Sequence, residues 1–188
     1  MSPLAQLVSW LALAVVGLVF LVGYLLRRLE AARAGFFAQL DRLGPTGAGA
    51  RRLLTFGGRP IRVEHRDSFL SLTMGISASG SFLIEKRGAV DGFLERAGLQ
   101  GKIATNDARF DSFFHIISDD ADFAAACFAS MKRREAVWAL FGEGCSRVEL
   151  GEKGLQAVWT PFQIDGDTSA EFVKRSLPLL AVLGDELP

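Results

Sequence analysis

The chain has 188 residues, with 21 acidic and 21 basic side chains, so its formal net charge at pH 7 is zero. Its two cysteines are too few for a disulfide framework, and the chain lacks the interleaving of basic and aromatic residues typical of nucleic-acid binding. The composition therefore argues against a disulfide-stapled secreted domain and against a nucleic-acid partner.

Residues 1–26 contain no charged side chain, and Arg27 and Arg28 end this run abruptly. A helix over residues 3–26 would be about 36 Å long, against a hydrocarbon core of about 30 Å. A secretory signal would need basic residues before the apolar core and a small-x-small cleavage site after it, and neither is present. The run predicts a retained transmembrane helix over residues 1–26, with a cleaved signal or a buried core helix as alternatives.

The charges after this run are unevenly spread. Nine arginines and three acids between residues 27 and 66 give a net charge of +6, and 12 basic against 18 acidic residues afterwards give −6. The positive-inside rule then predicts a single-pass protein of the cell (inner) membrane with its C-terminal domain in the cytoplasm. Basic residues beside the span are attracted to anionic lipids. The residues expected to contact the membrane surface are Arg27, Arg28, Arg33, Arg51 and Arg52.

Residues 27–43 have apolar side chains at helical spacing and predict an amphipathic stem helix. Its apolar stripe allows three arrangements: a homodimer through a short coiled coil, packing on the soluble domain, or a helix lying on the membrane. Residues 44–50 are rich in glycine and predict a flexible linker that would leave the domain free to swivel.

Residues 51–188 are long enough for one soluble domain with a core of its own. Alternating apolar and polar residues, with glycine-rich or polar breaks between them, predict strands that pair in sequence order as an antiparallel meander. The predicted strands cover residues 52–56, 60–65, 69–76 and 81–85.

The second half of the domain mixes helices and strands without a regular alternation, so the fold class is α+β, with an antiparallel sheet and three to four helices. Helices are predicted over 90–97, 121–129, 133–141 and from Thr168 to residue 183, the last kinked or restarted at Pro178. Strands are predicted over 102–105, 113–117, 147–150 and 155–160.

One stretch resembles a known family. It reads Thr105-Asn106-Asp107, Phe110-Asp111, an aromatic strand over 113–117, then Ser118-Asp119-Asp120. Together with the later hairpin around Gly154, this pattern is similar to bacterial membrane-anchored proteins of unknown function of the DUF3137 type, over about residues 60–183. The resemblance implies a membrane-anchored α+β protein and supplies no activity.

The chemistry-bearing residues have structural interpretations. Asn106, Asp107, Asp111, Ser118 and Asp119 are expected to form turns and helix caps, with Asp111 accepting from an arginine or a backbone N–H. The two histidines, His65 and His115, lie fifty residues apart without partners at metal-ligand spacing, so no metal and no cofactor are predicted. Of the cysteines, Cys127 is expected to be buried and Cys145 to be the more exposed.

The sequence therefore predicts a non-enzymatic module at the membrane, anchored by residues 3–26, that binds an unknown protein partner or lipid. Two alternatives remain open, a membrane-tethered enzyme and an apolar-ligand carrier, both using residues 105–122. A concave pocket beside residues 113–117 would favour either alternative, whereas a shallow exposed surface would favour the interaction module.

Overall fold

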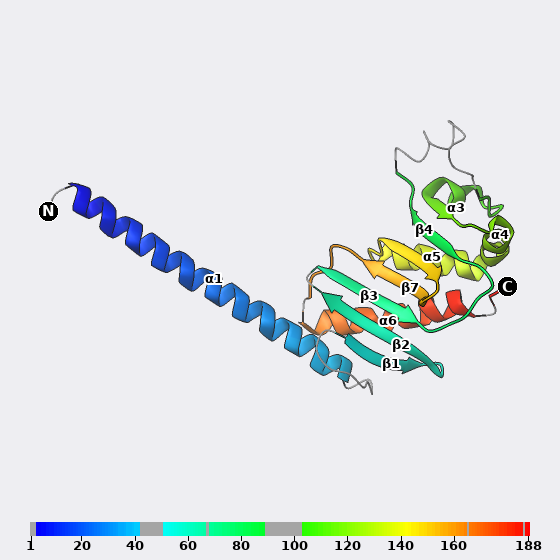
Figure 1. The fold of residues 1–188 in the computed structure, drawn as a ribbon, viewed down its shortest axis with the longest axis horizontal. Coiled ribbons are helices and arrows are strands. Elements are labelled where there is room, and N and C mark those ends of the chain that lie inside the picture. The colour runs from blue at the N-terminus through cyan, green and yellow to red at the C-terminus, as the bar shows by residue number, and fades with distance from the viewer. Residues whose placement is uncertain (1–2, 42–50, 67, 89–102, 165, 186) are drawn as a thin grey trace.

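The computed structural model describes residues 3–41, 51–66, 68–88, 103–164, 166–185 and 187–188, without the side chains of residues 3–9, 11–12 and 166–168. A long N-terminal helix leads into an α+β domain (Figure 1). The elements are α1 (Pro3–Asp41), β1 (Arg51–Phe56), β2 (Arg59–Arg66), β3 (Phe69–Met74), β4 (Phe82–Lys86), α3 (Ala108–Phe113), β5 (Phe114–Ile117), α4 (Ala121–Ala129), α5 (Met131–Gly142), β6 (Arg147–Gly151), β7 (Gly154–Trp159) and α6 (Gly166–Gly184).

Helix α1 is a single helix of 39 residues, about 58 Å at about 1.5 Å per residue. It joins the predicted span and the predicted stem without a break. All side chains described between residues 13 and 30 are exposed, although most of them are apolar. The helix therefore projects from the domain as an arm (Figure 1).

The predicted transmembrane helix over residues 1–26 falls only partly within the described structure, because residues 1–2 and several side chains of the first turns lie outside it. Among the residues that are described, no helix is both long enough and apolar enough to cross a membrane. The structure thus does not confirm this prediction.

The end of α1 packs on the domain. Phe36 and Leu40 are completely buried, and α1 lies against α6. The guanidinium of Arg52 lies 4.7 Å from the centre of the Phe37 ring and pairs with Asp41 at 2.7 Å. Of the three arrangements open for the stem, the structure has the one in which it packs on the domain. The predicted linker over residues 44–50 lies outside the described residues, but the buried contacts before it contradict a freely swivelling domain.

The sheet has seven strands in the order β1-β2-β3-β7-β6-β4-β5, and all neighbours are antiparallel. The turn between β1 and β2 uses Gly57 and Gly58, whose positive φ angles of 57° and 76° suit a tight hairpin. The predicted meander is correct for β1 to β3 and wrong for β4. Four of the six residues of β3 are buried, and the strand pairs with β7, while the chain after β3 crosses to the other half of the sheet.

Helices α5 and α6 pack together, and α6 lies against β3 and β7. In Figure 1 no helix passes in front of β1, β2, β3 and β7 on the opposite side. The main core lies between this sheet and its helices, where alternate strand residues such as Val63, Leu72 and Ala157 are fully buried. Pro178 lies inside α6, which continues to Gly184 without a restart.

Two local predictions differ from the structure. Residues 108–113, expected as a loop and strand, form α3, because Asp107 caps a helical turn there. Of the expected strand over 102–105, the described residues 103–105 form no strand, and Thr105 bonds to Asp111. The expected helix over 90–97 lies outside the described residues, as does the side chain of Thr168.

The docking of α1 gives a first prediction. Phe36→Ala would leave a cavity between α1 and the domain and lower the free energy of unfolding by about 3 kcal/mol. Leu29→Ala is the matched control, because Leu29 is 63% exposed on the same helix and its loss changes stability by less than about 0.5 kcal/mol. Urea unfolding of the full chain in detergent micelles measures both, and equal effects of the two substitutions would contradict the docking.

Candidate functional site

The polar residues singled out in the sequence come together between α3, α4 and the start of α5. Asn106 has a positive φ of 62°, which turns the chain into α3. Asp107 follows in an extended conformation, and its Oδ1 accepts hydrogen bonds from the backbone N–H groups of Arg109 at 3.1 Å and Phe110 at 3.0 Å. Asp107 is therefore the N-cap of α3.

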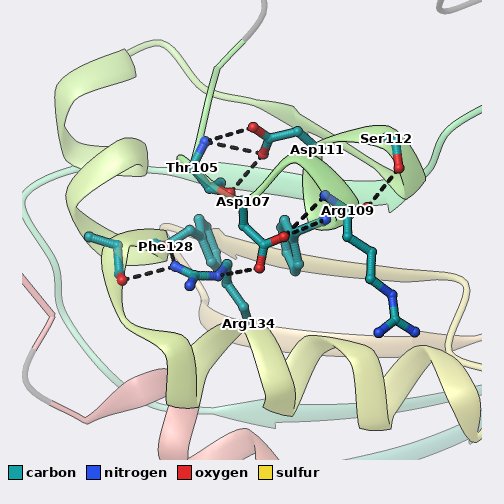
Figure 2. Close-up of polar contacts among 9 residues, drawn as sticks. Thr105, Asp107, Arg109, Asp111, Ser112, Phe128 and Arg134 are labelled. Carbon is teal, nitrogen blue, oxygen red and sulfur yellow. Dashed lines mark hydrogen bonds and ion pairs between the residues drawn. The ribbon is translucent and has the colours of Figure 1, made fainter.

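Arg134, which lies in α5, connects this cap of α3 to the end of α4. Its Nε donates to the second carboxylate oxygen of Asp107 at 3.2 Å, as Figure 2 shows. Its Nη1 donates to the carbonyl oxygens of Phe128 at 2.6 Å and Ala129 at 2.9 Å, at the end of α4. The hydrogen bond from the Phe110 N–H, together with the hydrogen bonds and charge of Arg134, holds the pKa of Asp107 below its usual value of 3.8.

Asp111 lies on the next turn and is buried. It accepts hydrogen bonds from the backbone N–H of Thr105 at 3.1 and 3.2 Å and from the Thr105 hydroxyl at 2.7 Å (Figure 2). The carboxylate therefore fixes the chain that enters α3, through the backbone N–H that the sequence had suggested as one of two donors.

Both carboxylates are occupied by protein donors. Asp107 and Asp111 each use both oxygens in hydrogen bonds within the chain. Four surface cavities of about 490, 670, 320 and 310 Å³ are lined by described residues, and neither aspartate lines any of them. The arrangement suits a clamp that joins α3, α4 and α5 rather than a general base, which needs a carboxylate open to substrate.

Of the expected turn and cap over Ser118-Asp119-Asp120, Ser118 forms the turn, because its hydroxyl accepts from the N–H of Asp120 at 3.1 Å. Asp120 is the N-cap of α4 and accepts from the N–H of Phe123 at 2.9 Å. The Ser118 hydroxyl donates to the Ser81 carbonyl at 2.5 Å and thereby fixes the start of this turn beside β4. Asp119 lines the 490 Å³ cavity instead of capping the helix.

The arginines expected at the membrane surface have different surroundings. Arg27, Arg28 and Arg33 are exposed on α1. Arg51 is 63% exposed and pairs with Glu64 at 3.2 Å. Arg52 is enclosed by Phe37 and Asp41, with only 11% of its side chain exposed, so the expectation of a lipid contact at Arg52 is wrong.

The histidines and cysteines are buried. His115 lies in β5, and His65 packs between the rings of Phe36 and Phe162. Cys127 is buried as expected, whereas Cys145, expected to be exposed, is only 2% exposed and donates to the carbonyl of Val158. Over the described ranges, no group of three or more His, Cys, Asp or Glu side chains is placed to hold a metal ion.

Sequence reasoning missed the role of the neighbouring Arg133 and Arg134. Arg133 donates to the carbonyl oxygens of Cys127 and Asp185, so the two arginines together satisfy the last carbonyls of α4. The available signal was the basic run Lys132-Arg133-Arg134 shortly after the break at Ser130, because cations favour helix C-termini.

No family model matches the chain, and no curated protein matches it. Among solved structures, the crystal structure of the mycobacterial trehalose monomycolate transport factor A, TtfA, is similar to it with a TM-score of 0.45 and 9% sequence identity. The match covers 79% of this chain and 83% of that chain. This similarity is too distant to carry an argument, and the resemblance to DUF3137-type proteins stays a prediction.

The lowered pKa of Asp107 gives a prediction about acid stability. Because the folded-state pKa lies below the usual 3.8, the ionised carboxylate stabilises the fold above that value, and this stabilisation is lost as the pH falls through it. The free energy of unfolding, measured by urea denaturation, should therefore fall less steeply between about pH 5 and pH 3 in Asp107→Asn than in the parent chain. Asp122→Asn removes the same charge from the first turn of α4. A flattening of equal size in both variants would contradict the capping role.

The cysteines give a third prediction. Burial raises the pKa of Cys145 to about 12 and that of Cys127 to about 11, so little reactive thiolate forms at neutral pH. Neither thiol should react with a disulfide reagent until the domain is unfolded, whereas a Met131→Cys variant, at a position 64% exposed, should react at once. Rapid labelling of the parent chain would contradict the burial of the cysteines, and the variants Cys127→Ser and Cys145→Ser would show which of the two reacts.

Proposed function

We propose that the chain is a single-pass membrane protein, anchored by residues 3–26, whose cytoplasmic α+β domain is a non-enzymatic module that binds a protein or lipid at the membrane. The observation that carries the proposal is the arm formed by α1. Its described apolar side chains from residue 13 to residue 26 are exposed, and Arg27 and Arg28 follow them directly. An exposed apolar surface of this length needs an apolar environment, and a lipid bilayer supplies one.

The packing of the end of α1 on the domain determines how far the domain would lie from the membrane. Phe36 is buried ten residues after Leu26, which corresponds to about 15 Å of helix. The domain would therefore lie close to the cytoplasmic leaflet in a defined orientation. The exposed Arg27, Arg28 and Arg33 lie between anchor and domain, where anionic lipid headgroups would attract them.

The polar cluster supports binding over catalysis. The alternatives, a membrane-tethered enzyme or an apolar-ligand carrier using residues 105–122, need a pocket with free polar groups or apolar walls. Asp107 and Asp111 accept bonds from within the chain, and no residue of 113–117 lines any of the four cavities.

Deletion of residues 1–26 tests the anchor. The deleted chain keeps Phe36 and Leu40, so the domain retains its docked helix and should fold. We expect the parent to remain in the membrane fraction after washing with alkaline carbonate, and the deleted chain to move to the soluble fraction. A parent that carbonate releases would contradict the anchor.

A reporter fused after residue 188 tests the orientation. A fluorescent protein that matures only in the cytoplasm should be bright in the full-length fusion, because the basic residues follow the span. A reporter that is active only outside the cytoplasm would reverse the proposed topology while leaving the anchor itself intact.

A further inference from the structure

The face of the sheet opposite α6 carries side chains in a regular pattern across six neighbouring strands. The registers of β1, β2, β3, β7, β6 and β4 align these side chains in two rows. They alternate along each strand with residues of the core, so they lie on the opposite side of the sheet, which no helix covers at β1, β2, β3 and β7 in Figure 1. At the centre of this side Ser71 and Val158 are buried, with 2% and 3% exposed. We call this side the free face.

Over the six strands from β1 to β4 the first row of the free face begins and ends with charged residues, and on the edge strand β5 it continues to the buried His115. Each pairing in the row comes from the strand registers, beginning with Arg51 beside Glu64 on β1 and β2. In the strand order β1-β2-β3-β7-β6-β4, the row reads Arg51, Glu64, Ser71, Val158, Arg147, Glu85.

The second row lies two residues further along each strand. It begins with Leu53 beside Arg62 and ends with Glu149 beside Leu83. In the same strand order, the row reads Leu53, Arg62, Thr73, Gln156, Glu149, Leu83.

When the strand order of either row is reversed, each residue comes to lie opposite a residue that complements it. Two copies would face each other in this way about a two-fold axis that is parallel to the strands and lies between β3 and β7. This axis would place β2 of one copy over β6 of the other, and β1 over β4. Every charge then faces an opposite charge, leucine faces leucine, and the centre is uncharged. The facing residues are Arg51 with Glu85, Glu64 with Arg147, Arg62 with Glu149, and Leu53 with Leu83.

We propose that the free face binds a second copy of this chain, face to face, about this two-fold axis. A symmetric dimer requires such self-complementarity, because each side presents the same surface. Within the monomer, Arg51 pairs with Glu64 at 3.2 Å and Arg147 with Glu149 at 3.9 Å. In the described part of the chain Arg62 and Glu85 have no ion pair, so the dimer gives each of them a partner.

The charged residues of the free face determine how the affinity of this dimer depends on salt. Sheets that pack face to face lie about 10 Å apart, which leaves room for arginine and glutamate side chains to meet. Most contacts are between charged residues at a solvated surface, so the association is weakened by salt and is tightest at low ionic strength.

The direction of α1 is compatible with this dimer. In the view of Figure 1 the axis of α1 is nearly parallel to the axes of the antiparallel strands β1, β2 and β3, so rotation about an axis parallel to the strands leaves both α1 helices pointing the same way. If the proposed anchor holds, both copies enter one membrane. A homodimer through the stem is less favoured, because Phe36 and Leu40 of the stem are buried within their own chain.

Charge exchange tests the pairing of Arg62 with Glu149. The full chain in detergent micelles at low salt is studied by analytical ultracentrifugation as a function of concentration. Arg62→Glu brings two like-charged pairs together across the axis and should raise the dimer dissociation constant about tenfold. Glu149→Arg should do the same, and the double variant R62E/E149R should restore the parental value.

A charge change outside the free face is the matched control for the dimer dissociation constant. Arg175→Glu makes the same charge change on α6, outside the free face, and should leave dimerisation unchanged. A parent chain that stays monomeric would overturn the proposal. So would a dimer that R62E does not weaken, or a double variant that does not recover, because either result would place the contact elsewhere, as on α1. The test reads association in micelles, so its result is independent of whether residues 3–26 anchor the chain in cells.

Discussion

The burial of Phe36 and Leu40 is the contact on which the rest of the molecule depends. These side chains join a long apolar helix to an α+β domain that would otherwise be connected through residues 44–50 alone. Arg52 reinforces the contact by lying over Phe37 and pairing with Asp41. The helix and the domain thus behave as one body, and whatever surrounds the helix also determines the orientation of the sheet.

The polar residues of α3, α4 and α5 join these three helices to one another through hydrogen bonds. Asp107 and Arg134 satisfy the ends of α3 and α4, and Asp111 secures the chain that enters α3. Because these groups are committed to hydrogen bonds within the chain, they stabilise the fold. The proposal of an interaction module rests on this commitment of Asp107 and Asp111.

The sequence predicted the elements whose patterns are local. The alternation of β2, the glycines of the first hairpin and the apolar helical spacing before Leu43 all correspond to observed structure. It failed where the outcome depends on distant residues. The pairing of β3 with β7 joins strands about 80 residues apart, and Cys145 is buried beside Val158, contacts that no local pattern reveals. Asp107 and Asp111 were expected to be structural, but Arg134 was missed because its partners lie on other helices.

The central claim is that α1 holds the domain in one orientation, and a distance measured across their junction tests it most directly. Spin labels at Leu29 on the exposed part of α1 and at Lys174 on α6 can be introduced as cysteines, because the native cysteines are buried. Electron–electron resonance on the full chain in phospholipid nanodiscs should give one narrow distribution of distances. A broad distribution would show that the domain swivels about its linker and would contradict the account.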